Sequence, residues 1–205
     1  MSEMREYYEK EYNEAEFEAD MQRNNRLRFC FPDEINGKKI LSIGSGPGVD
    51  IQFLTPGNEI HAMDISRKAL DVAQASGYIV HQFDLNANTP FPFEDGYFDI
   101  VVATDILEHI FDPLRVMLEL RRVLNDKGEA LLSVPNHFYF SRRVAMLFGK
   151  GIVLPFHNSN EWDYFHIRFF TLKEWEKFLD KSGQVWIARK REAIRQFLPD
   201  TLWIT

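Results

Sequence analysis

The sequence predicts an α/β protein with a doubly wound, mostly parallel sheet and helices on both faces. Three observations lead to this fold class. After the turn signal Asn36-Gly37, short apolar runs alternate with stretches of helical periodicity. The run from Phe98 to Ala103 is almost wholly apolar, which is typical of a parallel strand buried on both faces. The first run leads into a glycine-rich loop, and the next two runs end on the acids Asp64 and Asp84.

Five strands follow from the apolar runs, each of which is bounded by residues that favour turns. They are predicted over residues 39–43, 59–63, 78–83, 98–103 and 130–134. A loop containing Pro90, Pro92 and Gly96 connects the third strand to the fourth. The parallel arrangement places the carboxyl ends of these strands at one edge of the sheet.

Helices are expected between the strands. A short helix follows the glycine loop and stops at Pro56-Gly57. Ser66 is a suitable N-cap for a second helix that runs to Ala75. A third helix is predicted from Asp112-Pro113 to the turn Asp126-Lys127-Gly128, and a fourth begins near Leu172.

Two segments depart from this alternation within a chain that we treat as one domain, residues 1–205. Residues 1–30 form a predicted N-terminal helical segment, in which apolar side chains recur every three or four residues at Met4, Tyr8, Tyr12, Ala15 and Ala19. This segment is either an ordinary packed helix or a lid over a ligand site. Residues 137–170 form a long, irregular segment rich in aromatic side chains, and such an insertion is usually functional. We expect it to be either a cap over the acceptor or an interface, for example that of a homodimer.

Composition and charge exclude several classes of protein. Hydrophobic residues make up 45% of the 205 residues, so a sizeable core is expected. Residues 1–20 hold eight acids and two bases, which is −6 of the net charge of −7; the remainder is nearly neutral and does not favour nucleic-acid binding. No apolar run is long enough to cross a membrane, no secretory signal is recognised, and the single Cys30 forms no disulfide framework. These features predict a cytoplasmic protein that acts on a small molecule.

The residues that carry chemistry lie at strand ends. Gly44, Gly46 and Gly48 alternate directly after the first strand, and glycine lets the main chain come into contact with a ligand. Asp64 lies twenty residues after Gly44, where a carboxylate at a strand end accepts hydrogen bonds from the ribose hydroxyls of an adenosine. Asp84 ends the third strand on the same edge, where we expect it and Leu85 to border an adenine ring. The three strand ends therefore predict a crevice for an adenosine-containing ligand.

Two other nucleotide sites fit the spacing less well. Dinucleotide-binding loops place their third glycine five residues after the first, where this chain has Val49. A phosphate-binding P-loop requires Gly-Lys-Ser/Thr, which does not follow here. A nicotinamide-dependent oxidoreductase and an ATPase are therefore disfavoured.

The motifs resemble those of class I S-adenosylmethionine-dependent methyltransferases of the small-molecule branch. ILSIGSGPG (residues 40–48) is similar to the first motif of the family, AMDIS (62–66) to the second, FDLN (83–86) to the third and FDIVVATDILEHIFDP (98–113) to the fourth. LLSVPN followed by HIRFFTLKEWEKFLDKSG is similar to the methionine-biosynthesis protein W group. The resemblance covers most of residues 38–183.

The resemblance implies a Rossmann-like sheet of seven strands with an antiparallel last strand, the last two at residues 185–189 and 202–205. It implies S-adenosylmethionine across the carboxyl ends of strands one to four, with S-adenosylhomocysteine as product. The family usually has an acid where this chain has Ser42, whose hydroxyl can also hydrogen-bond loop amides. The implied cofactor-binding residues are Gly44, Ser45, Gly46 and Gly48 on the loop, Asp64 and Ile65 at the ribose, Asp84 and Leu85 at the adenine, and Thr104 and Asp105 at the methionine portion.

The implied reaction is in-line displacement at the sulfonium methyl, which needs a base only when the acceptor arrives protonated. His109, His137 and His166 are the candidate catalytic residues, in that order. The alternative for His109 is a packed histidine at the start of a helix. Asp105, Glu108 and His109 also resemble the divalent-metal arrangement of ubiquinone-biosynthesis methyltransferases, but the Glu-His pair occurs in members without metal and we predict none.

Four residues are expected on the acceptor side: Tyr8, Tyr12, His166 and Arg168, the last of which suits a carboxylate or phosphate. The sequence leaves open which acceptor is used and whether its oxygen, nitrogen, carbon or sulfur is methylated. A second class also stays open, a methyltransferase-like regulatory or partner subunit without turnover of its own.

Overall fold

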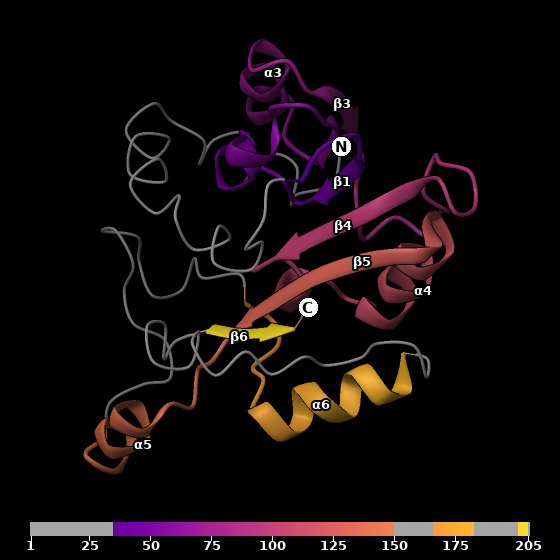
Figure 1. The fold of residues 1–205 in the computed structure, drawn as a ribbon. Coiled ribbons are helices and arrows are strands. Elements are labelled where there is room, and N and C mark those ends of the chain that lie inside the picture. Colours follow the sequence, from indigo (N-terminus) through magenta and orange to yellow (C-terminus); the bar gives the residue numbers. More distant parts are fainter. Residues whose placement is uncertain (1–34, 150–165, 183–200, 205) are drawn as a thin grey trace.

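A computed structural model describes residues 35–149, 166–182 and 201–204, which fold around one six-stranded sheet (Figure 1). The strands lie in the order β3-β2-β1-β4-β5-β6. Neighbours from β3 to β5 are parallel, and β6 pairs antiparallel to β5. The strand bounds are β1 Lys39–Ile43, β2 Glu59–Asp64, β3 Ile79–Gln82, β4 Phe98–Thr104, β5 Leu124–Pro135 and β6 Thr201–Ile204.

This topology confirms the Rossmann-like α/β prediction for the described residues. The order of strands reverses between β1 and β4, which is the switch point where open α/β sheets bind ligands. The antiparallel strand at the end of the chain is also as predicted. The predicted strand at residues 185–189 lies outside the described residues, as does the N-terminal helical segment.

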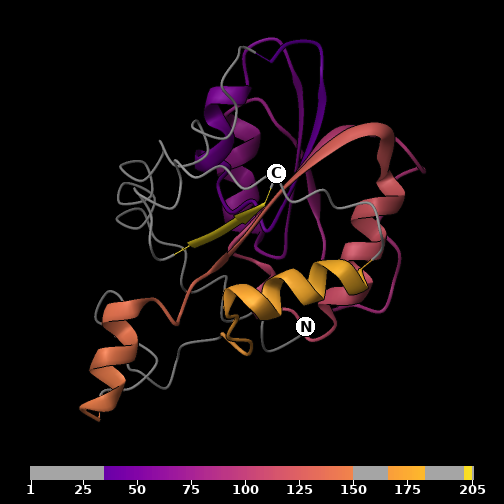
Figure 2. The same cartoon turned by 60° about the horizontal axis from the view of Figure 1, so that its bottom comes forward.

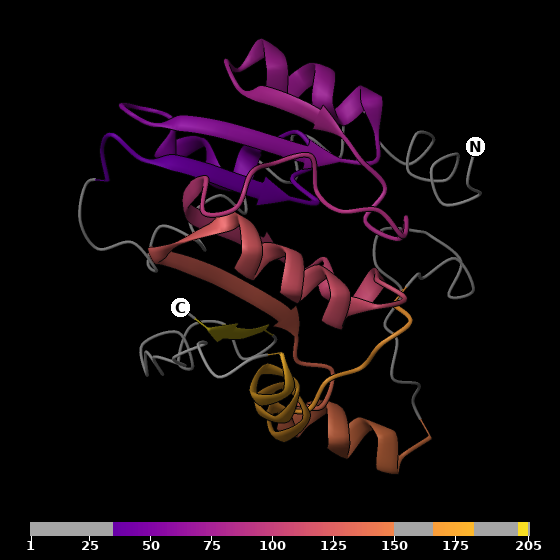
Figure 3. The ribbon, with the colours of Figure 1, turned by 90° about the vertical axis from the view of Figure 1, so that its right-hand side faces the viewer.

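Alternating side chains of the strands build a hydrophobic core on each face of the sheet. Leu41 and Val101 point to one face, where they pack with α4 (Pro113–Val123) and α6 (Leu172–Lys181). Their neighbours along the strands, Ile40 and Ile100, point to the other face. There α3 (Arg67–Ala75) and the short 3₁₀ helix η2 (Val49–Leu54) complete the core. Figure 3 shows α4 lying along β5.

Local caps fix where three helices begin. The Ser66 hydroxyl accepts from Ala69 N at the start of α3, as predicted, and the Asp112 carboxylate accepts from Arg115 N at the start of α4. Thr171 and Glu174 form a reciprocal capping box at α6, which explains why the helix starts sharply at Leu172.

The predicted end of the third helix is wrong. The helix ends at Val123, and β5 begins at the next residue, Leu124, instead of after Gly128. Phe98 pairs with Leu124 but Ile100 pairs with Glu129, so the register shifts and residues 125–128 depart from regular pairing. The Asn125 amide donates to Asp99 Oδ1 and anchors this departure to β4, a contact between residues 26 positions apart that spacing does not reveal.

The predicted irregular segment, residues 137–170, contains a helix in its described part. This helix, α5 (Phe140–Leu147), follows β5 and lies apart from the sheet (Figure 2). Phe140, Leu147 and Phe148 are each more than 80% exposed, so the helix contributes little to the two cores. None of the described helices is both long and apolar enough to pass through a membrane.

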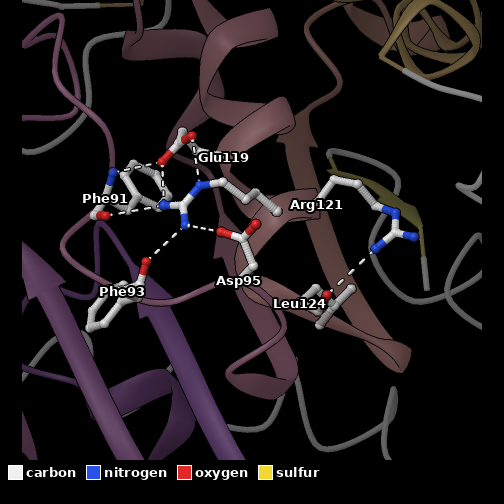
Figure 4. Close-up of polar contacts among 7 residues, drawn as sticks. Phe91, Phe93, Asp95, Glu119, Arg121 and Leu124 are labelled. Atoms are coloured by element: carbon white, nitrogen blue, oxygen red, sulfur yellow. Dashed lines mark hydrogen bonds and ion pairs between the residues drawn. The ribbon is translucent and has the colours of Figure 1, made fainter.

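Arg122 of α4 holds the loop between β3 and β4 (Figure 4). Its guanidinium donates to the carbonyl oxygens of Phe91 and Phe93 and pairs with Asp95 and Glu119, both at 2.7 Å. The hydrogen bonds from Arg122 to the Glu119 carboxylate lower the pKa of Glu119 below its ordinary value. The long loop after β3 is therefore tied to α4.

Candidate functional site

The glycine loop is held by the acid that ends the next strand. Asp64 is buried, and its Oδ2 accepts from Gly46 N at 2.8 Å while its Oδ1 accepts from Ser66 N at 2.8 Å. In the described residues this loop amide is therefore bonded by Asp64 and not by Ser42, although Ser42 is buried beneath the loop.

Gly44 stands where a side chain has no room. Its φ is +58°, and a Cβ added there would lie 2.5 Å from Ile106 Cγ1. L-residues rarely adopt this conformation, and the contact would displace the segment after β4. The glycine therefore keeps the end of β1 close to the end of β4, at the switch point.

Gly44 lines two cavities. The larger, of about 230 Å³, has apolar walls with several acids at the strand ends; it is lined by Gly44, Asp64, Ile65, Phe83, Asp84, Leu85, Asn86, Asp105, Ile106, His109 and Ile110. The smaller, of about 110 Å³, is lined by Ser42, Gly44, Ser45, Gly46, Pro47, Val49, Asp50, Ile51 and Thr104. A mostly apolar cavity with acids in its lining suits a purine nucleoside, whose ring is apolar on both sides and whose ribose donates hydrogen bonds.

Nine of the ten predicted cofactor-binding residues line one or both cavities, and Gly48 does not. Gly48 instead packs against Tyr78: its φ is +78°, an added Cβ would lie 2.2 Å from Tyr78 Cε2, and Tyr78 Oη donates to Gly48 O. The geometry thus gives the third glycine a packing role at the start of η2. Asn86, Ile106 and Ile110 line the larger cavity and were not singled out from the sequence.

Asp105 adopts a left-handed backbone conformation with a φ of +49°, the one non-glycine case among the described residues. Its N–H donates to Ser133 O at 3.1 Å, and its Oδ1 accepts from Ser133 Oγ at 3.0 Å. Non-glycine residues in this region cost of order 1–3 kcal/mol and cluster at functional sites. Hydrogen bonds to β5 hold Asp105 in this conformation where it lines the larger cavity.

The three predicted catalytic histidines come together beside this cavity, although they are far apart in sequence. His137 Nε2 and His166 Nδ1 are 2.9 Å apart, and the rings of His166 and His109 meet edge to face with centroids 4.5 Å apart. His109 belongs to the 3₁₀ helix η3 (Leu107–His109) and is the one of the three that lines the larger cavity.

Burial weakens two of these imidazoles, those of His137 and His166, as bases. It lowers the pKa of His166 to about 2, with further lowering by the nearby His109 and His137. Burial also lowers the pKa of His137, and the positive charge of Arg142 lowers it further. Both rings are therefore neutral and weak bases near pH 7, whereas an effective base has a pKa near the working pH.

Glu108 lies at the centre of the histidine cluster. It is fully buried, and burial together with Asp105 raises its pKa well above the ordinary value. Neither carboxyl oxygen has a hydrogen-bond partner among the described residues; Oε1 lies 3.7 Å from His166 Nε2 and 3.9 Å from His109 Nε2. Glu108, His109 and His166 each present a ligand atom within 4.8 Å of the others, and such a set can hold a metal ion. It differs from the set considered from the sequence, Asp105, Glu108 and His109, in having His166 in place of Asp105.

Arg168 points its guanidinium at main-chain carbonyls. Its Nε donates to Ile110 O at 3.0 Å, and its Nη2 donates to Phe111 O. The other two predicted acceptor-side residues, Tyr8 and Tyr12, lie outside the described residues.

Comparison with known proteins identifies the family. Residues 11–185 match the sequence model of a family described as a methyltransferase domain. The chain belongs to this methyltransferase family. It is a class I enzyme whose methyl donor is S-adenosylmethionine, and Gly44 and the strand-end acids provide a cradle that fits the nucleoside of this donor.

Curated relatives of this methyltransferase include two ubiquinone biosynthesis O-methyltransferases. The protein of Aromatoleum aromaticum is 27% identical over 167 residues, which are 78% of this chain and 70% of the relative. The protein of Paraburkholderia phymatum is 30% identical over 154 residues, which are 73% of this chain and 65% of the relative. The chain thus spans about two thirds of the length of these relatives.

Solved structures show the same fold at low identity. A methyltransferase of Thermotoga maritima, described as a possible histamine N-methyltransferase, is 21% identical with a TM-score of 0.63 and covers 86% of this chain and 79% of its own. An S-adenosylmethionine-dependent methyltransferase of Mesorhizobium loti is 18% identical with a TM-score of 0.61 and covers 87% of this chain and 94% of its own.

Proposed function

We propose that this methyltransferase transfers the methyl group of S-adenosylmethionine to a small-molecule acceptor. The observation that carries the proposal is the larger cavity, which brings the carboxyl-end residues of four adjacent strands to one space beside Gly44. The nearly neutral charge of residues 21–205 does not favour a nucleic-acid acceptor. The acceptor space adjoins His109, at the end of the cavity that faces the histidine cluster.

Within this proposal the strand-end acids bind the nucleoside. Asp64 accepts from the ribose hydroxyls while its amide contacts keep the glycine loop in place, and Ile65 covers the sugar. Asp84 and Leu85 border the adenine, with Phe83 as a further apolar wall. Thr104 and Asp105 flank the methionine portion, beside Gly44, Ser45 and Gly46.

The bound donor supplies a sulfonium leaving group, so the chain has to position the acceptor and accept its proton. Positioning of two reactants contributes up to about 7–11 kcal/mol in favourable systems. His109 is the proposed base, since it lines the cavity while burial makes His137 and His166 weak bases. His137 and His166 then act as neutral walls of the acceptor space.

The experiment that tests this function is a transfer assay with a methyl-labelled donor. Fractions of a metabolite extract and a panel of phenols, amines, thiols and carboxylates are offered as acceptors; hydroxyl acceptors come first because the curated relatives are named O-methyltransferases. We expect label in at least one small molecule, and loss of that label with Asp84→Ala. Label found only in protein or nucleic acid, or donor binding without transfer to any fraction, would contradict the proposal and favour a regulatory subunit.

A further inference from the structure

The two residues that follow η3 are held by hydrogen bonds from both sides of the site. On one side, Phe111 N donates to Asn86 Oδ1 at 2.8 Å. On the other side, the Arg168 guanidinium donates to Ile110 O and Phe111 O. The peptide units around Phe111 therefore link a residue of the nucleoside cavity to a residue of the acceptor side, 82 positions apart in sequence.

Core packing does not determine where Phe111 lies. Its side chain is 64% exposed, whereas the neighbouring Ile110 is buried and lines the larger cavity. The buried Ile110 anchors one residue of this segment in the core, and hydrogen bonds to the main chain set the position of Phe111. A guanidinium that bonds two successive carbonyls fixes both distance and direction.

The Asn86 end of this link is rigid. Asn86 N donates to Asp84 Oδ1 at 2.9 Å, which forms a turn of the kind that aspartate favours. Arg115 of α4 donates to Leu85 O and, at 3.0 Å, to Thr89 O. The wall of the nucleoside cavity is thus tied to the start of α4, and Asn86 presents its side-chain oxygen from a fixed turn.

The Arg168 end of this link lies next to His166, which contacts His109. The main-chain N–H groups of Ile167 and Arg168 donate to Glu108 O at 3.1 and 3.2 Å. These bonds hold residues 166–168 against η3, which places the His166 ring on the His109 ring. A displacement of Arg168 therefore moves both the Phe111 main chain and the segment that contacts His109.

We propose that Asn86, the Phe111 main chain and Arg168 form a brace that couples the nucleoside cavity to the acceptor side. Asn86 and Arg168 are positioning residues: an adenine nucleoside bound beside Asn86 steadies the brace, and the brace holds His109 in place for the acceptor. The role of Arg168 is then to orient the main chain instead of gripping an acceptor. This inference rests on the proposed function, because it takes the larger cavity as the nucleoside site.

The first test needs no ligand. Amide hydrogen exchange at Phe111 is measured by NMR in the wild type, Asn86→Ala, Arg168→Met and Arg143→Met. Arg143 is the matched control, an exposed arginine of α5 that donates to Phe138 O. We expect Arg168→Met to speed exchange of the Phe111 amide about tenfold, although Arg168 bonds only the carbonyl side of the segment. Unchanged exchange in Arg168→Met would overturn the brace.

The second test measures the coupling. Calorimetric titration with S-adenosylhomocysteine is expected to give binding about tenfold weaker than in the wild type for Asn86→Ala and for Arg168→Met. The double variant is also expected to bind about tenfold more weakly than the wild type, because either substitution alone already breaks the brace. Arg168→Lys keeps the charge without the fork and is expected to behave like Arg168→Met, while Arg143→Met stays within about twofold of the wild type. Wild-type affinity in Arg168→Met, or a double variant about a hundredfold weaker, would reject coupling through the brace. A wild type that does not bind this ligand would contradict the proposed function, and the exchange result would still decide the brace.

Discussion

The cofactor rim and the acceptor side of this methyltransferase are built by different means. The proposed cofactor rim comprises the strand-end residues 44–46, 64–65 and 84–86, and the proposed acceptor side comprises His109, His137, His166 and Arg168. The rim rests on bonds between neighbouring strand ends, such as Gly46 N to Asp64, and on tight turns. The acceptor side depends on contacts between distant residues, such as Arg168 to Ile110 across 58 positions. The rim is therefore held by contacts between strand ends that the sheet brings side by side, whereas the acceptor side is held by contacts between segments far apart in the sequence.

Removal of the proposed base should have the largest effect and separate the two regions. His109→Ala is expected to lower kcat by about 10²- to 10⁴-fold, the usual range for a general base. Binding of S-adenosylhomocysteine should change by less than about threefold, since the rim is intact. His137→Ala serves as control and should lower kcat by less than about tenfold, because its ring is a weak base. Wild-type turnover in His109→Ala would remove the base from the mechanism.

A side chain at Gly44 should disrupt the rim next. Gly44→Ala adds a Cβ against Ile106 at a residue with a left-handed backbone conformation. We expect the unfolding free energy, measured by urea denaturation, to fall by about 3 kcal/mol. Gly37→Ala is the matched control, because its φ is +70° and nothing lies within 4 Å of the added Cβ. It should lose only about 1–2 kcal/mol. Equal losses in the two variants would show that the contact with Ile106 has no influence.

The acceptor side should be sensitive to acid. His166 has a pKa of about 2 when folded and an ordinary pKa near 6.5 when unfolded, so the unfolded chain binds more protons between these values. Its stabilising contribution is complete above pH 6.5 and is lost as pH falls, by up to about 1.4 kcal/mol per pH unit. His166→Gln should flatten the curve of unfolding free energy against pH between 7 and 4. An unchanged slope, with both curves referred to pH 8, would contradict the burial that lowers this pKa.

The smallest effect is expected on α5, which follows β5 and belongs to neither of the two regions. Leu147 is 85% exposed, so Leu147→Ala should change the unfolding free energy by less than about 0.5 kcal/mol. Leu179→Ala on α6 is the comparison, since Leu179 is buried in the core and should lose about 2–5 kcal/mol. A large loss in Leu147→Ala would mean that α5 packs on the protein more closely than the structure shows.

Much of the fold and rim could be predicted because their signals are local. The apolar run of β4, the spacing of the glycines after β1 and the acids that end β2 and β3 are each recognised within a short stretch of sequence, although Gly44 and Asp64 contact distant residues. Ser66 was recognised as an N-cap for the same reason.

The remainder depends on distant partners. The observed end of α4 differs from the predicted end because Leu124 pairs with Phe98 and Asn125 bonds to Asp99. The meeting of His109 with His166, and the direction of Arg168, follow from hydrogen bonds between the segment at 166–168 and η3. No spacing within either segment indicates such bonds. A cavity residue such as Asn86 could have been found from FDLN, where its amide follows the adenine-side acid.

Titration of the protein with S-adenosylhomocysteine, for the wild type beside Asp64→Ala, addresses the methyl-donor site itself. Asp71→Ala is the control, an exposed acid of α3 that pairs with Arg67. We predict micromolar binding by the wild type and by Asp71→Ala, with at least about tenfold weaker binding by Asp64→Ala, which loses both the ribose acceptor and the support of Gly46. Equal affinity in all three proteins would show that Asp64 does not hold the nucleoside.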